Sequence, residues 1–189
     1  MGKMTKGRIT FEEAASEAQF GYVKGECKWA KVLDPDDYDN FSISMYGDSV
    51  IELEEELLAM QKSANKEVED LGKKTMLADV IKVDNDGGKF IGFKLASKNF
   101  DGENNSIKMY DAGGNLVEDW DKLVGNGSTV KIKYRIAPYY MSSTKMVGIS
   151  FKFYACQVIN LVEFKAQDSG FGDETSEDGG ITEGNNEDF

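Results

Sequence analysis

The chain has 189 residues, of which 40% are hydrophobic, and its formal net charge is −12. It contains no histidine, which excludes Ser–His and Cys–His nucleophile pairs and most zinc sites. Cys27 and Cys156 are its two cysteines, Met1–Phe11 carries no secretory-signal pattern, and no apolar run approaches the roughly 20 residues of a membrane helix. These features predict a protein of a reducing compartment that does not enter a membrane.

The charge is distributed unevenly along the chain. Residues 1–70 carry 8 basic and 16 acidic groups, whereas residues 71–167 carry 14 basic and 10 acidic groups. Residues 168–189 carry eight carboxylates and no Lys or Arg. The central part is therefore cationic although the whole chain is acidic, and such asymmetry between segments indicates interaction surfaces better than the average charge does.

Residues 1–18 are polar and are predicted to form a flexible N-terminal segment. Strands are predicted over 22–33 and 41–46, where apolar and polar side chains alternate in the second run. Between them, Pro35 stands among Asp and Asn residues, which is the composition of a turn.

A single amphipathic helix is predicted over residues 48–71. Apolar residues recur there at spacings of three and four, at Val50, Leu53, Leu57, Met60 and Ala64. Asp48 or Ser49 is expected to cap its start, with Glu52 completing a capping box, and Gly72 to end it. The stripe is also compatible with a coiled-coil seam, but it is shorter than about four heptads, which favours packing on a sheet.

After Gly72, short strands are predicted between glycine-containing turns, over 76–83, 89–97, 106–110, 129–136 and 145–164. The segment 84–88 has the composition of a hairpin turn. About seven strands around one helix, without βαβ alternation, predict a mostly β domain over residues 19–167, either a small antiparallel barrel or a sandwich. A barrel with a capping helix is the OB-fold arrangement.

The C-terminal residues 168–189 are predicted to be a disordered acidic tail, because they offer too little apolar surface to compensate the entropy of ordering them. The chain ends on an apolar aromatic residue, Phe189, preceded by Glu187 and Asp188. This tip is predicted to bind a partner, and the acidic arm is predicted to compete for the ligand of the folded domain. A plain solubility arm is the alternative.

The sharpest alternation in the chain runs from Val130 to Ile136. It places Lys131, Lys133 and Arg135 on one face, with cations about 7 Å apart, a spacing that suits the phosphates of a single strand. A solvated outer face with lysines that protect a sheet edge explains the same pattern.

Aromatic residues accompany these cations. Tyr139 and Tyr140 lie in a predicted loop that also carries Lys145. On the strand that follows, Lys152 and Tyr154 are predicted to share one face. In the first strand, Trp29 is predicted to share a face with Cys27 and Lys31. Proteins that hold single-stranded nucleic acid combine a cationic groove with stacking rings, although core packing is the alternative for Trp29, Phe151 and Phe153. The predicted phosphate contacts are Lys31, Lys131, Lys133, Arg135, Lys145 and Lys152, and the predicted stacking residues are Trp29, Tyr139, Tyr140 and Tyr154.

Other chemistry finds little support in the sequence. The acidic run 34–39 fails the EF-hand pattern because Tyr38 and Asp39 occupy positions that need Asp/Asn and Gly. No phosphate loop of the form GxxxxGK[ST] occurs, and no spacing of carboxylates predicts a nuclease metal site. The sequence therefore predicts neither an enzyme nor a metal or cofactor.

Several segments resemble tailed-bacteriophage single-stranded DNA-binding proteins. They are Lys28–Asp36, Gly125–Lys131, Pro138–Tyr140, Ser143–Lys145, Val158–Val162 and the acidic tail ending in Phe189. The resemblance covers most of residues 20–189. It implies an OB-fold, with the helix as an insertion into the barrel, that coats single-stranded DNA during phage replication and recombination in the cytoplasm of the infected bacterium.

The resemblance also implies that the tail contacts a phage or host DNA polymerase and helicase-primase. Because family members differ in oligomeric state, it leaves both a monomer and a homodimer open. The alternative function is a protein-interaction module in which the acidic tail binds a basic partner and the barrel is structural.

Overall fold

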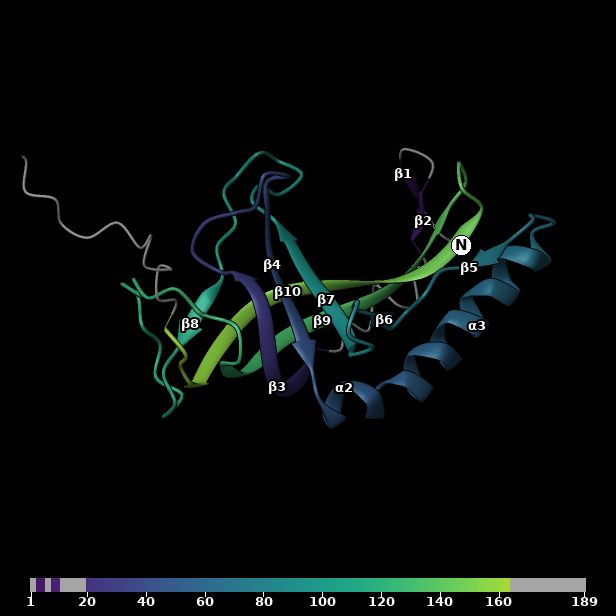
Figure 1. The fold of residues 1–189 in the computed structure, drawn as a ribbon. Coiled ribbons are helices and arrows are strands. Elements are labelled where there is room, and N and C mark those ends of the chain that lie inside the picture. Colours follow the sequence, from purple (N-terminus) through teal and green to yellow (C-terminus); the bar gives the residue numbers. More distant parts are fainter. Residues whose placement is uncertain (1–2, 6–7, 11–19, 164–189) are drawn as a thin grey trace, which may run out of the picture.

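The structure, a computed structural model, describes residues 3–5, 8–10 and 20–163 of the chain. This part contains ten strands and two helices (Figure 1). The strands are β1 (Lys3–Thr5), β2 (Arg8–Thr10), β3 (Phe20–Lys31), β4 (Asn40–Tyr46), β5 (Met76–Leu77), β6 (Lys82–Val83), β7 (Lys89–Ala96), β8 (Lys108–Tyr110), β9 (Thr129–Met141) and β10 (Met146–Asn160). The helices are α2 (Asp48–Glu52) and α3 (Glu54–Asp70).

Five strands form a nearly closed barrel in the order β9-β3-β4-β7-β10 and back to β9. All neighbours are antiparallel except β7 and β10, which run parallel and meet at one registered pair, Lys94 and Lys152. A five-stranded barrel of this kind is the OB-fold arrangement. The predicted mostly β fold with an OB-like barrel and an inserted helix is therefore confirmed.

The barrel interior is filled by one apolar cluster. Its fully buried members include Ile43, Ile91, Phe93, Ile132 and Phe153, and Phe151 packs against Phe93 at 5.4 Å between ring centres. These residues come from β4, β7, β9 and β10, and on each strand their neighbours in sequence point outward, as the period of two requires. The outer wall of the barrel is thus left to polar and aromatic side chains.

The predicted helix is present but is divided at Leu53 into α2 and α3. The predicted side-chain caps are wrong: the residue before α2 is Gly47, with no side-chain hydrogen bond. Its end is as predicted. Gly72 has φ 73°, and the N–H groups of Gly72 and Lys73 donate to the carbonyls of Glu69 and Val68. These bonds form a Schellman motif, which needs a left-handed residue at this position.

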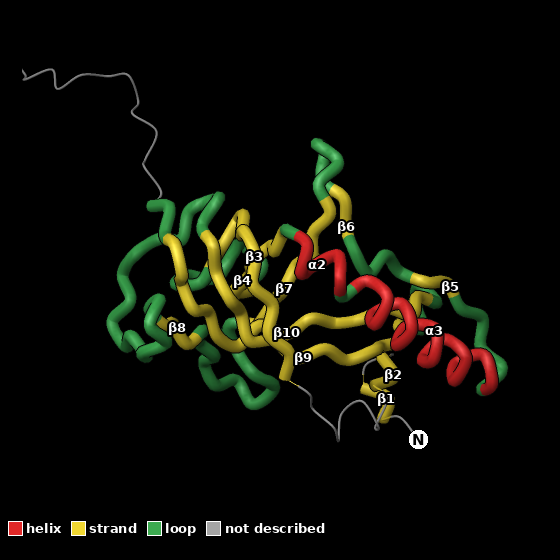
Figure 2. The backbone as a smooth tube through the Cα atoms, turned by 90° about the horizontal axis from the view of Figure 1, so that it is seen from below, coloured by secondary structure: helices red, strands yellow, loops and turns green. Residues whose placement is uncertain are grey.

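The strands β9 and β10 extend beyond the barrel as a long hairpin, and α3 lies along this extension (Figure 2). The prediction of a loop over 137–146 is wrong for most of its length, because β9 continues through Pro138 to Met141. Pro138 lies between the last β3 partner of β9 (at Arg135) and the first β2 partner (at Tyr139). On that edge its missing N–H removes no ladder bond, which explains why the strand tolerates it.

Two bulges alter the predicted facing of side chains. In β3 the register shifts between Lys28 and Lys31, and Trp29 has φ 51°. Cys27 is consequently fully buried whereas Trp29 is 54% exposed, so the prediction that they share a face is wrong. In β10 the shift around Tyr154 pairs Ala155 with Lys133, so Ala155 does not share the inner face of Phe153 as predicted.

The predicted hairpin around 84–88 is confirmed, since β6 and β7 pair across it. The strand predicted over 76–83 is instead divided into β5, which pairs with β10, and β6. Within the predicted N-terminal segment 1–18, β1 and β2 pair with each other and β2 pairs with β9. The acidic tail, residues 168–189, lies outside the described residues.

Candidate nucleic-acid interface

Lys131 and Lys133 lie on the outer wall of the barrel between β3 and β10. Their cross-strand partners on β3 are Lys24 and Tyr22, and Val130, Ile132 and Tyr134 point into the core, so the predicted alternation of β9 is confirmed. The Lys131 Nζ lies 5.3 Å from the centre of the Tyr22 ring. The Lys133 Nζ lies 4.3 Å from the centre of the Phe20 ring and 6.0 Å from that of Tyr22.

The two rings on β3 are open to solvent: Phe20 is 47% and Tyr22 58% exposed. Phe20 also contacts Tyr154 of β10 edge to face, at 5.5 Å between ring centres. Beside them is an open pocket of about 280 Å³, lined by Tyr22, Tyr110, Gly114, Lys131, Lys133, Ala155 and Gln157. We call Phe20, Tyr22, Lys131, Lys133 and Tyr154 the aromatic–cationic face.

A row of cations runs around the outer wall of the barrel, from one strand to the next. Lys31 of β3 pairs with Ser42 of β4, Ser42 pairs with Lys94 of β7, Lys94 pairs with Lys152 of β10, and Lys152 pairs with Arg135 of β9. Cross-strand partners point to the same side of a sheet, and the three lysines are exposed. We call Lys31, Lys94, Lys152 and Arg135 the cationic belt.

The belt reaches both ends of the barrel's aromatic surface. Arg135 pairs with Phe20, which belongs to the aromatic–cationic face, and Lys31 follows Trp29 in β3. Neighbouring strands lie about 4.8 Å apart, so four steps from Arg135 to Lys31 cover roughly 19 Å. The bulge at Trp29 shifts the alternation by one residue, and this shift places Lys31 on the outer wall.

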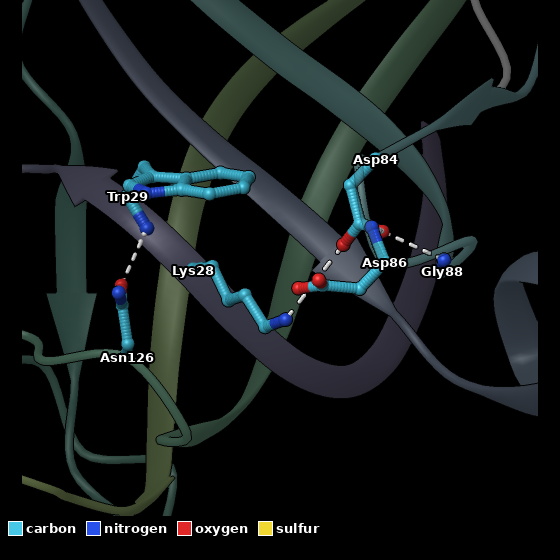
Figure 3. Close-up of polar contacts among 6 residues, drawn as sticks. All are labelled: Lys28, Trp29, Asp84, Asp86, Gly88 and Asn126. Atoms are coloured by element: carbon cyan, nitrogen blue, oxygen red, sulfur yellow. Dashed lines mark hydrogen bonds and ion pairs between the residues drawn. The ribbon is translucent and has the colours of Figure 1, made fainter.

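Trp29 forms a second aromatic cluster, with Tyr46 of β4 and Phe90 of β7. The Tyr46 and Phe90 rings are stacked at 5.3 Å, and the indole meets both edge to face at 6.3 and 6.2 Å. Figure 3 shows how the backbone of Trp29 is held: its N–H donates to Asn126 Oδ1 at 2.8 Å. The indole is therefore an exposed ring on a fixed backbone.

Lys28 contributes little to the positive charge of the outer wall. Its Nζ lies 4.5 Å from the centre of the Tyr46 ring and 3.8 Å from Asp84 Oδ2 (Figure 3). The N–H of Gly88, followed by that of Asp86, holds the pKa of Asp84 below its usual value. Burial, with the nearby charge of Asp84, raises the pKa of Tyr46 to about 12. Asp84 is thus a fixed anion that neutralises Lys28.

The structure brings most of the predicted phosphate contacts together. Lys131 and Lys133 belong to the aromatic–cationic face, whereas Lys31, Arg135 and Lys152 belong to the cationic belt. Tyr154 and Trp29 lie at the two ends of this surface. The predicted tail residues Glu187, Asp188 and Phe189 lie outside the described residues.

Three predicted residues lie elsewhere. Lys145 is in the turn of the β9–β10 hairpin, about 30 Å along β9 from Lys131 at the rise of a strand. Tyr140 is 3% exposed in a second apolar cluster with Ala64, Val68 and Val147, and its hydroxyl donates to the Lys74 carbonyl. Tyr139 is half-buried on the same extension. Tyr140 cannot stack on a base from this position, because α3 covers it.

Sequence reasoning did not single out Phe20, Tyr22 or Lys94. The alternation of Phe20, Tyr22 and Lys24 around the buried Val23 was a usable signal for the first two. The sequence holds no such signal for Lys94, because it alternates with core residues as any lysine on the outer face of a strand does. Its place in the belt depends on its neighbours in β4 and β10, which are far away in sequence.

Solved structures of phage proteins have the same architecture. The crystal structure of gp2.5, a single-stranded DNA-binding protein encoded by bacteriophage T7, matches with a TM-score of 0.66 at 18% sequence identity, over 88% of this chain and 100% of that chain. The chain has the fold of these single-stranded DNA-binding proteins.

The single-stranded DNA-binding protein of bacteriophage Enc34 matches with a TM-score of 0.53 at 15% identity, over 90% of this chain and 93% of that chain. Its complex with single-stranded DNA matches with the same TM-score and identity, over 87% of this chain and 96% of that chain. At the level of sequence, neither a protein-family model nor a curated protein matches the chain.

Two further findings concern the described residues only. They contain no group of three or more Cys, Asp or Glu side chains placed to hold a metal ion. None of their helices is long and apolar enough to span a membrane.

Proposed function

We propose that this chain binds single-stranded DNA without sequence specificity, on the outer wall of its barrel. The observation that carries the proposal is the cationic belt, which joins two groups of exposed aromatic rings across neighbouring strands. A cationic track beside stackable rings is the arrangement that holds single strands irrespective of sequence, because every base has a π-face.

In this proposal the belt and the two lysines of β9 contact phosphates. A path of roughly 19 Å fits within the about 4–16 nucleotides that one OB-fold covers. The outward positions between the belt cations are small, Ser42 and Ser44 on β4 and Gly92 on β7, and a Cβ at Gly92 would meet nothing within 4 Å. A strand can therefore lie close to the backbone of β4 and β7.

Bases stack on Phe20, Tyr22 and Tyr154 at one end of the belt and on Trp29 at the other. Each stacked base contributes about 1–3 kcal/mol. Lys131 and Lys133 lie over the rings of Tyr22 and Phe20, so base and phosphate contacts are offered side by side. The Enc34 protein with the same fold, crystallised with single-stranded DNA, supports the proposal.

The proposal is tested by fluorescence anisotropy with labelled oligo-dT and with a duplex of equal length. Wild-type protein is expected to prefer the single strand. The double variant Lys133→Gln/Lys152→Gln is expected to bind about tenfold more weakly near 0.1 M salt, because two phosphate contacts are lost.

The matched control is Lys62→Gln/Lys66→Gln, which removes the same charge from exposed positions of α3. It is expected to change the affinity less than twofold. Equal weakening by both double variants, or equal affinity for single strand and duplex, would contradict the proposed interface.

Finer parts of the proposal concern the acidic tail. We propose that the protein serves phage replication and recombination, and that residues 168–189 compete with DNA for the barrel and contact a polymerase and helicase-primase through Phe189. Eight tethered carboxylates act at an effective concentration that reaches the millimolar range. Deletion of residues 168–189 should therefore tighten binding of oligo-dT, most at low salt; unchanged binding at low salt would rule the competition out.

A further inference from the structure

A pocket of about 540 Å³ opens beside Trp29, at the Lys31 end of the belt and apart from the aromatic–cationic face. Its size lies within the about 300–1,000 Å³ of small-ligand sites. Its walls come from the end of β3, the segment 123–126 and the residues that follow β10; they are Trp29–Asp34, Leu123–Asn126, Val162 and Glu163.

We propose that this pocket receives one unstacked nucleobase of the bound single strand, with the Trp29 indole as its stacking face. The inference rests on the proposed function and assigns a site to that function. Leu123 and Val162 add apolar surface to the pocket and are 55% and 42% exposed. Exposed apolar side chains next to an indole favour contact with a flat, weakly polar ring such as a nucleobase over contact with water.

The walls are fixed by hydrogen bonds to the barrel. The Cys27 N–H donates to the Ser128 carbonyl at 2.9 Å, and the Gly127 N–H donates to the Cys27 carbonyl at 3.0 Å. The Gly125 N–H donates to the Val162 carbonyl, and the Val162 N–H donates to Ser128 Oγ, both at 2.9 Å. The pocket is therefore formed before a ligand arrives, which lowers the entropic cost of binding.

Asn126 is the positioning residue of the site. Trp29 holds a left-handed backbone conformation, φ 51°, which is unfavourable for a bulky residue. The bond from its N–H to Asn126 Oδ1 holds this backbone conformation, from which the indole reaches its edge-to-face contacts with Tyr46 and Phe90. No described residue accepts a hydrogen bond from the Asn126 amide nitrogen, which remains available to the edge of a base.

The charges at the rim connect the pocket to the belt. Lys31 lines the pocket and is also the first cation of the belt, so a strand whose phosphates follow the belt delivers a base to the indole. Asp34 and Glu163 also line the rim, and Glu163 lies 3.6 Å from the Lys122 Nζ. An apolar peptide is the other conceivable occupant, but it has no use for the belt that ends here.

The test uses the fluorescence of Trp29 in a Trp120→Phe background, where Trp29 is the one remaining tryptophan. Oligo-dT is expected to quench this emission. Val162→Phe fills the pocket without changing the charge, and it should remove most of the quenching and weaken binding by about fivefold or more. The dependence of affinity on salt should stay as in the parent, because phosphate contacts are intact.

Val83→Phe is the matched control, since Val83 is 62% exposed on β6 and does not line the pocket. It should leave both quenching and affinity unchanged. Quenching and affinity retained in Val162→Phe would overturn the nucleobase pocket while leaving the proposed function in place. Absence of any binding by the parent would instead overturn the proposed function itself.

A second variant tests the role of Asn126. Asn126→Ala is expected to reduce the quenching of Trp29 with the salt dependence unchanged, whereas Asn115→Ala, which removes another loop amide that bonds within its own turn, should leave the quenching unchanged. Full quenching in Asn126→Ala would show that Asn126 does not position the indole.

Discussion

Gly21 of β3 faces Tyr134 of β9 across the barrel wall. The Tyr134 ring occupies the space that a Cβ at Gly21 would need, and Tyr134 in turn packs against Phe93 at 5.1 Å between ring centres. The absence of a side chain at Gly21 therefore lets a large ring fill the barrel interior between Phe20 and Tyr22, which both point outward.

Gly21→Ala is expected to lower the free energy of unfolding by about 1–3 kcal/mol, the usual cost of overpacking. Gly92→Ala is the control, because a Cβ there would meet nothing within 4 Å, and it should change the stability by less than about 0.5 kcal/mol. Urea denaturation followed by circular dichroism measures both. Equal stability of the two variants would show that the wall accommodates a methyl group at Gly21.

The buried thiol of Cys27 makes the stability of the fold depend on pH. Burial raises the pKa of its thiol from 9.0 to about 12, so between these values the unfolded chain releases this proton while the folded chain keeps it. Stability is therefore complete below pH 9 and falls as the pH rises towards 12. Cys27→Ala should be less stable at pH 8 but should lose less stability between pH 8 and pH 10; an equal loss would exclude Cys27 as a source.

At the scale of elements, the sequence predicted what depends on local periodicity. The alternation of β9, the stripe of the helix and the hairpin at 84–88 are patterns of a few residues, and the structure contains all three. The predicted side of the sheet was wrong for side chains near the two bulges, at Trp29 and after Tyr154. One extra residue reverses the direction of every later side chain in the strand, and the bulge leaves no signal in the sequence. Tyr139 and Tyr140 suggested a loop because Pro138 precedes them, whereas a gap in the neighbouring ladder admits the proline.

Gln61 shows how α3 is attached to the hairpin extension. It is 1% exposed, and its Nε2 donates to the carbonyls of Ala78 and Val147 at 2.6 and 2.9 Å. Gln61→Leu should leave two acceptors without this donor and cost about 1–3 kcal/mol of stability.

The affinity of Gln61→Leu for oligo-dT should be unchanged, because α3 packs on the extension rather than on the belt. Lys62→Ala, at the adjacent exposed position, serves as the control for both measurements. A loss of DNA affinity in Gln61→Leu without loss of stability would show that the extension takes part in binding.

On the scale of the whole molecule, the fold converts scattered lysines into one surface. Lys31, Lys94, Arg135 and Lys152 lie 63, 41 and 17 positions apart in sequence. Only the barrel register brings them into one row around the outer wall. The charge of residues 71–167 predicted that a cationic surface exists. Its course could not be predicted, because the pairing of β7 with β10 depends on barrel closure and not on any local pattern.

The dependence of oligo-dT affinity on salt concentration tests the central claim most directly. Six cations, the belt together with Lys131 and Lys133, each neutralise one phosphate of the strand in this account. A plot of log K against log salt should therefore have a slope of about −4, from about −0.7 per phosphate. Replacing Lys94 by Gln should reduce the steepness by about 0.7. A slope near zero would contradict binding of single-stranded DNA along the belt.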